Sequence, residues 1–192
     1  APEQIVALGT DQLDALSSSQ VRALSSTQIG ALTTAQLKAL AATLISEMAS
    51  TQVGQLGTAQ ILALGTTGID ALASTQIGAL RSSQLQALTT AQVAALSSAN
   101  LREFSSSQLH ALSSAQIRAI ETADLAALTT SQVAALRTGQ IESLTTSQIV
   151  ALGSTQIQSL TSGQLRALGT GQIRAIESSD IGVLGTGQIR AF

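Results

Sequence analysis

The sequence repeats every eight residues. Read in steps of eight from Gln4, it gives QIVALGTD, QLDALSSS, QVRALSST and QIGALTTA, and the same register continues to QIRAF without an insertion or deletion. We number each octad from this glutamine, so that position 1 is Gln4 in the first octad and Gln188 in the last. A period this strict predicts one local structure that is used 24 times.

Each position of the octad has its own chemistry. Position 2 is Ile, Leu or Val in all 24 octads, position 5 is Leu in 19 of them, and position 4 is mostly Ala. Position 7 is Ser or Thr in every complete octad except the one that contains Ala42. Position 3 varies widely, and its residues include Arg22, Lys38, His110 and Glu142. We therefore predict that positions 2 and 5 form the core and that position 3 faces solvent.

Three backbones can be tested against this pattern. In one continuous helix, eight residues overshoot two full turns by about 80°, so the apolar stripe would wander around the helix. In a strand, position 5 would share a face with the charged position 3. A very short helix followed by a turn places positions 2 and 5 on the same helical face. The sequence thus predicts an all-α solenoid or superhelix of 24 such units, with a parallel β-solenoid as the alternative.

The residues between the apolar positions carry helix signals. The string Ser/Thr-Ser/Thr-x-Gln resembles a capping box, although the pattern does not decide whether position 6 or position 7 is the cap. Glycine at position 6, as at Gly9, Gly57 and Gly153, predicts a helix C-terminus. The 19 glutamines at position 1 have two interpretations, which are an amide ladder between stacked octads and capping of the helix start.

One octad buries too little to fold alone. Two apolar side chains do not offset the conformational entropy of ordering eight residues, so neighbouring octads must stack. We therefore predict a single continuous array over residues 1–192. It would be elongated, with a thin apolar core and a Ser/Thr-rich surface. The array resembles a segment of a longer repeat protein or filament.

A second, longer period of 56 residues lies within the short one. Among the octads that lack glutamine at position 1, Leu44 and Asn100 are 56 residues apart, and so are Gly68, Asp124 and Asp180 in succession. The same spacing relates Glu121 to Glu177 and Arg81 to Arg137. This super-repeat of seven octads indicates either a genetic duplication or a superhelix in which seven octads complete a whole number of turns.

Composition removes several classes of function. Charged residues make up 10% of the chain, aromatic residues 1%, and the net charge is −2, so we expect no nucleic-acid partner. The absence of cysteine excludes disulfides and thiolate metal sites. No apolar run approaches the length of a membrane span, so we expect none.

Candidate chemical sites are few. We find no catalytic constellation and no cofactor motif, and we predict that the chain is not an enzyme and needs no cofactor. His110 is the only histidine and is expected at the surface. The repeated pairs Glu121/Asp124 and Glu177/Asp180 are weak candidates for a hard cation such as Ca²⁺. The alternative is that their aspartates complement a helix N-terminus.

The string LTTAQVAALSSA at Leu88–Ala99 resembles octapeptide arrays of very large, adhesin-like proteins that bacteria secrete or display. The resemblance implies an extracellular or cell-surface location, with secretion signals elsewhere. We expect a structural repeat protein that forms a rod, fibre or stalk segment and assembles with itself, end to end or laterally. The alternative is a binding module that recognises a glycan, a surface or ice through a regular row of Ser and Thr.

Overall fold

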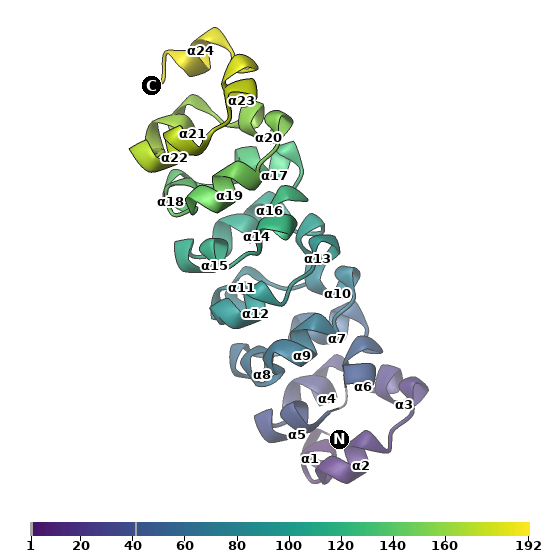
Figure 1. The fold of residues 1–192 in the computed structure, drawn as a ribbon. Coiled ribbons are helices and arrows are strands. Elements are labelled where there is room, and N and C mark those ends of the chain that lie inside the picture. Colours follow the sequence, from purple (N-terminus) through teal and green to yellow (C-terminus); the bar gives the residue numbers. More distant parts are fainter. Residues whose placement is uncertain (1, 41) are drawn as a thin grey trace. The chain divides into compact units, whose positions relative to one another are not determined.

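The chain is entirely helical wherever its structure is described. The computed structural model describes residues 2–40 and 42–192 and divides into two compact units, Ala1–Leu96 and Ser97–Phe192. The described residues form 24 helices of four to six residues and no strand (Figure 1). This confirms the prediction of one very short helix per octad and excludes the β-solenoid.

Each helix contains position 1 of the octad with the same number, so helices and octads share one numbering. The first unit contains α1 (Pro2–Val6), α2 (Thr10–Asp14), α3 (Ser18–Ala23), α4 (Ser26–Ala31), α5 (Thr34–Ala39), α6 (Ala42–Ser46), α7 (Ser50–Gln55), α8 (Thr58–Ala63), α9 (Gly65–Asp70), α10 (Ser74–Gly78), α11 (Ser82–Ala87) and α12 (Thr90–Ala94). The second unit contains α13 (Ser98–Arg102), α14 (Ser106–Ala111), α15 (Ser114–Arg118), α16 (Thr122–Ala126), α17 (Thr130–Ala135), α18 (Thr138–Glu142), α19 (Thr146–Ala151), α20 (Ser154–Ser159), α21 (Ser162–Ala167), α22 (Thr170–Ala175), α23 (Ser178–Gly182) and α24 (Thr186–Ile189).

Position 6 is the N-cap of the helices. In α3, the Ser17 hydroxyl accepts a hydrogen bond from the backbone N–H of Gln20 at 3.4 Å, and Gln20 Oε1 accepts one from the backbone N–H of Ser17 at 2.8 Å. This reciprocal pair is a capping box, which satisfies two backbone donors that a helix start leaves open. The sequence left the cap between positions 6 and 7, and the structure assigns it to position 6.

Many helices end by turning extended at position 5, as Leu24 does after α3 with φ −64° and ψ 131°. The next residue, at position 6, is extended as well and starts the following helix. Gly9, Gly57 and Gly153 are such N-caps, with φ between −69° and −77°. The prediction that they terminate helices is therefore wrong, because the chain reverses through two extended residues and needs no left-handed one.

The apolar positions form the core as predicted. Ile29, Leu37 and Val53 at position 2 are fully buried, and Leu56 and Leu112 at position 5 are too. Every described octad from the third to the twentieth buries its position 2 side chain. Position 3 is mostly exposed on the opposite side of each helix. Each short helix therefore contributes two core side chains and one outward-facing side chain.

Helices pack against others three and four octads away. Within the first unit, α1 contacts α4 and α4 contacts α7, and within the second unit α17 contacts α20. Hydrogen bonds reach one octad further, since the Gln36 amide in α5 donates to carbonyl oxygens of Ile5 and Leu8 in the first octad. One turn of each unit therefore holds between three and four octads (Figure 1).

Glutamine at position 1 connects consecutive turns. Gln84 is fully buried; its Oε1 accepts from the Arg81 N–H at 2.7 Å, and its Nε2 donates to the carbonyl oxygens of Val53 at 3.0 Å and Leu56 at 2.8 Å. The same arrangement recurs at Gln164 in the second unit. The glutamine thus caps its own helix and also donates to the backbone four octads earlier, which differs from a ladder between amides.

The seven-octad period has a structural counterpart. In the first unit, Arg81 Nη2 donates to the Leu56 carbonyl oxygen at 3.0 Å, and in the second unit Arg137 Nη2 donates to the Leu112 carbonyl oxygen at 3.0 Å. Donor and acceptor are 25 residues apart in both pairs. Two turns per seven octads would agree with a turn of between three and four octads. This geometry supports the superhelical interpretation of the 56-residue spacing.

Candidate interaction surfaces

The position 7 hydroxyl groups form the predicted polar surface in part. Most of these side chains are exposed, including Thr122, Thr146 and Thr170. Some also join turns, since Ser114 Oγ donates to the Gly139 carbonyl oxygen at 3.0 Å and Ser50 Oγ to the Thr75 carbonyl oxygen at 3.3 Å. The row therefore has two roles, which are display of hydroxyl groups and a hydrogen bond to the octad three places later.

Long polar side chains at position 3 make a similar connection. Arg22 Nε donates to the Glu47 carbonyl oxygen at 3.2 Å and Arg102 Nε to the Ala127 carbonyl oxygen at 3.0 Å. Arg22 also forms an ion pair with the Glu47 carboxylate. His110 is exposed, as predicted, and its Nε2 contacts the Ala135 carbonyl oxygen. These side chains lie across the outer surface and join successive turns.

The candidate cation pairs are placed on two different surroundings. Glu121 and Glu177 are exposed N-cap residues whose side chains make no capping hydrogen bond. Asp124 is partly buried, and Asp180 is 7% exposed. Asp124 Oδ1 accepts from Ser98 Oγ at 2.6 Å.

Asp180 has the same kind of partner, because its Oδ1 accepts from Ser154 Oγ at 2.5 Å. Within residues 2–40 and 42–192 no group of three or more His, Asp or Glu side chains is placed to hold a metal ion. The helix-start interpretation of these aspartates gains a specific partner, a serine hydroxyl on the preceding turn. Sequence reasoning missed that partner.

Shallow grooves lie between octads that are three places apart. One, of about 540 Å³, is lined in part by Arg102, Thr129, Thr130 and Thr155. Another, of about 570 Å³, is lined in part by Ser26, Thr27, Gly30 and Gln55. Their hydroxyl, amide and backbone groups could contact a polar ligand.

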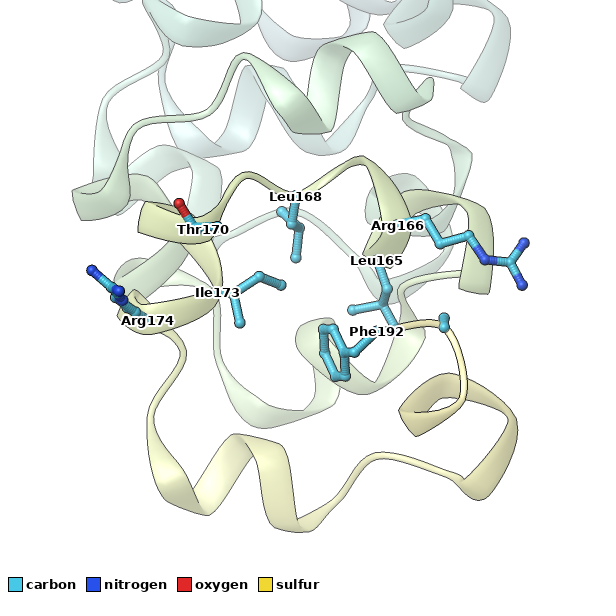
Figure 2. A pocket seen from close by; sticks show the side chains of 8 residues that line it. Leu165, Arg166, Leu168, Thr170, Ile173, Arg174 and Phe192 are labelled. Carbon is cyan, nitrogen blue, oxygen red and sulfur yellow. The ribbon is translucent and has the colours of Figure 1, made fainter.

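An apolar pocket lies at the last octads. It has a volume of about 370 Å³ and is lined by Leu165, Arg166, Leu168, Thr170, Ile173, Arg174, Ala191 and Phe192. In Figure 2 the Phe192 ring lies near Leu165, Ile173 lies on the other side of the opening, and both arginines point outward. The pocket contains core positions 2 and 5, so it is the uncovered end of the apolar core.

The fold and these surfaces define a helical tandem-repeat protein. The ALTTAQ repeat family matches six segments of the chain, residues 5–42, 69–98, 90–119, 117–154, 131–162 and 157–192. These segments cover most of the sequence, and the chain belongs to this family. No protein with a curated description matches it. In the described part of the chain, no helix has the length and apolar character needed to cross a membrane.

Proposed function

We propose that the chain is a structural repeat protein, a segment of a rod, fibre or stalk outside a bacterial cell. The recurring link from glutamine to backbone carries this proposal. Gln52 and Gln84 in the first unit and Gln140 and Gln164 in the second make the same bonds to the octad four places earlier. Because every contact of this kind is local, adding octads lengthens the array without a new design.

The surface chemistry supports the same role. The outward positions are dominated by Ser, Thr, Ala and Gly, and only 10% of residues are charged. The described pockets are lined by core ends or by shallow polar grooves. Such a surface suits a protein whose contribution is length and display. The extracellular location follows from the resemblance to secreted and displayed arrays.

Small-angle X-ray scattering tests this role. We expect the maximum dimension of the 192-residue chain to exceed that of a compact globule of equal mass. A second variant, with the 56-residue block 97–152 duplicated, should be longer by a constant increment per octad. A maximum dimension that grows only as the cube root of mass would overturn the proposal.

A second candidate function is recognition of a glycan, an ice surface or another regular surface by the hydroxyl row. Thr122, Thr146 and Thr170 favour it, because they are exposed and lie at the same position of octads three places apart. Replacing all three by Lys should abolish binding on a glycan array or the inhibition of ice recrystallisation. The matched control places Lys at Ala126 and Val150, which are exposed at position 3. Undiminished binding by the threonine variant would exclude this function.

A further inference from the structure

The two ends of the array present complementary groups. We define the leading face as the side of octads 1–4 (residues 4–35) that an earlier turn would cover. We define the trailing face as the side of octads 21–24 (residues 164–192) that a later turn would cover. Between them, each octad receives glutamine bonds from one turn and gives them to another.

The leading face carries hydrogen-bond donors without acceptors. Gln12, Gln20 and Gln28 cap their own helices through Oε1, as other glutamines do. No octad stands four places before them in the 192-residue chain, and within its described part their Nε2 groups make no hydrogen bond. Gln12 and Gln20 are exposed, whereas Gln84 is fully buried. Each of these amides therefore has an unused donor.

The trailing face carries the matching acceptors. Inside the array, the position 5 carbonyl oxygen of Leu144 accepts from Gln172 Nε2 at 2.7 Å, and that of Leu160 accepts from Gln188 Nε2 at 2.7 Å. The carbonyl oxygens of Leu168 and Ile176 occupy the same position in later octads and accept no hydrogen bond from any described residue. These carbonyl oxygens are left open in the same geometry that glutamine satisfies elsewhere.

Apolar surface is also unequal at the trailing face. Phe192 is 55% exposed and Ile189 is 45% exposed, although core positions inside the array are buried. Together with Leu165 and Ile173, Phe192 lines the open pocket (Figure 2). In internal turns the following octads fill this space with their own position 2 and position 5 side chains.

The charges of the two faces are opposite. The first two octads and the residues before them carry Glu3, Asp11 and Asp14 and no basic residue. Arg166 and Arg174 flank the trailing pocket. Opposite charges at two apolar, hydrogen-bonding faces favour one orientation of encounter and disfavour face-to-face pairing of identical ends.

We propose that the leading face of a second copy of this chain docks on the trailing face. The inference rests on the proposed structural role and names its partner and orientation. The octad register allows it, since Phe192 is at position 5 and Ala1 is at position 6. Gln12 of the second copy then donates to the Ile176 carbonyl oxygen, and its first octads cover the pocket around Phe192. The interface is heterologous, so repeated docking extends in one direction.

Sedimentation velocity of the 192-residue chain over a concentration series tests the docking. The trailing-face variant carries Ile189→Asp and Phe192→Asp, both at exposed side chains. The leading-face variant carries Gln12→Arg and Gln20→Arg, also exposed. We expect the unmodified chain to form multiples of its 19.4 kDa mass, and each variant alone to require at least a tenfold higher concentration. Far-UV circular dichroism checks that helix content is unchanged.

Mixing the two variants gives the decisive measurement. Each retains one intact face, so an equimolar mixture should form a dimer and nothing larger. Control variants with Gln86→Asp plus Val150→Asp, or with Gln86→Arg, change the charge at exposed position 3 sites and should assemble like the unmodified chain. A monomeric unmodified chain, a variant that assembles normally, or a mixture that stays monomeric would each overturn the docking. Scattering from the monomeric variants separates this result from the structural role, which fails only if the monomer is compact.

Discussion

Octads 9 and 23 lack glutamine at position 1 and replace it in different ways. In octad 23, Asp180 is 7% exposed and accepts a hydrogen bond from Ser154, 26 residues earlier. In octad 9 the equivalent residue is Gly68, and the residue 26 positions earlier is Ala42, the single position 7 that is neither Ser nor Thr. The two positions therefore change together, as an acid with a hydroxyl or as two small residues.

Octad 16 supports this relation. It follows the polar solution of octad 23, with Asp124 accepting from Ser98 at 2.6 Å. Both polar octads lie in the second unit and the small-residue octad lies in the first. A residue at position 1 thus depends on the position 7 side chain three octads earlier, which it meets on the preceding turn.

The backbone differs between the two solutions as well. Before Asp180, Glu177 is an extended N-cap with φ −68° and ψ 152°, as in octads that have glutamine. Before Gly68, Leu64 stays helical, and Gly65 takes a φ of 64°. The acid keeps the regular octad backbone, whereas loss of any position 1 side chain is accompanied by a different connection between α8 and α9.

The strongest way to break this comparison is to place the acid of octad 23 in octad 9. In Gly68→Asp, the new Cβ would lie 2.8 Å from Leu64 Cβ and 3.3 Å from Ile45 Cδ1. The carboxylate would be buried opposite Ala42, which has no hydroxyl. We expect the free energy of unfolding in urea to fall by about 3–5 kcal/mol.

The control for this substitution is the double variant Ala42→Ser with Gly68→Asp. The serine supplies the missing hydrogen-bond donor but leaves the contact with Leu64 unchanged, so only part of the stability should return. A Gly68→Asp variant within about 1 kcal/mol of the unmodified chain would show that the two octads are interchangeable.

The next largest effect tests the glutamine that both octads lack. Gln84→Ala removes a fully buried amide and leaves the carbonyl oxygens of Val53 and Leu56 without its donor. We expect a loss of about 2–3 kcal/mol in urea unfolding, because buried polar groups are left unsatisfied. The matched variant Gln20→Ala removes an exposed amide that caps only its own helix, and about 1 kcal/mol or less is expected. Equal losses would mean that the bonds between turns contribute nothing.

A smaller effect is expected within the polar solution itself. Ser154→Ala leaves the buried Asp180 carboxylate without its hydroxyl donor, and we expect a loss of about 1–2 kcal/mol. Ser98→Ala should cost less, because Asp124 is more exposed. Hydrogen exchange of the amides in α16 and α23 would locate each effect. A greater loss for Ser98→Ala would contradict the role assigned to burial.

Sequence periodicity predicted the local structure well. Spacing alone placed positions 2 and 5 on one helical face, and the burial of Ile29 and Leu56 confirms it. The N-cap at position 6 was narrowed to two positions. The glycine prediction was wrong at Gly57, because the preference of glycine for helix ends was applied without knowing that the chain turns through extended residues.

The contacts between turns could not be predicted from local pattern. Which carbonyl oxygen Gln84 meets depends on the number of octads per turn, and this is set by packing among octads far apart in sequence. Two signals were nevertheless present. The seven-octad recurrence allows two turns, and the lone exception Ala42 lies 26 residues before the exception Gly68. Such paired exceptions identify residues that meet across a turn.

The smallest effects concern two glycines at position 6 of successive octads, Gly57 and Gly65. Gly57 has φ −72° and ψ 164°, close to Ser17 with φ −73° and ψ 160°, and an added Cβ would meet only Gln60 Oε1 at 3.5 Å. Gly57→Ser supplies a capping hydroxyl, and we expect a gain of a few tenths of a kcal/mol, measured by thermal and urea unfolding. Gly65→Ser should instead lose about 1 kcal/mol, because φ 64° is strained for a residue with a Cβ. Opposite signs one octad apart would show that octad 9 departs from the repeat in its backbone, and equal signs would place the difference in side chains alone.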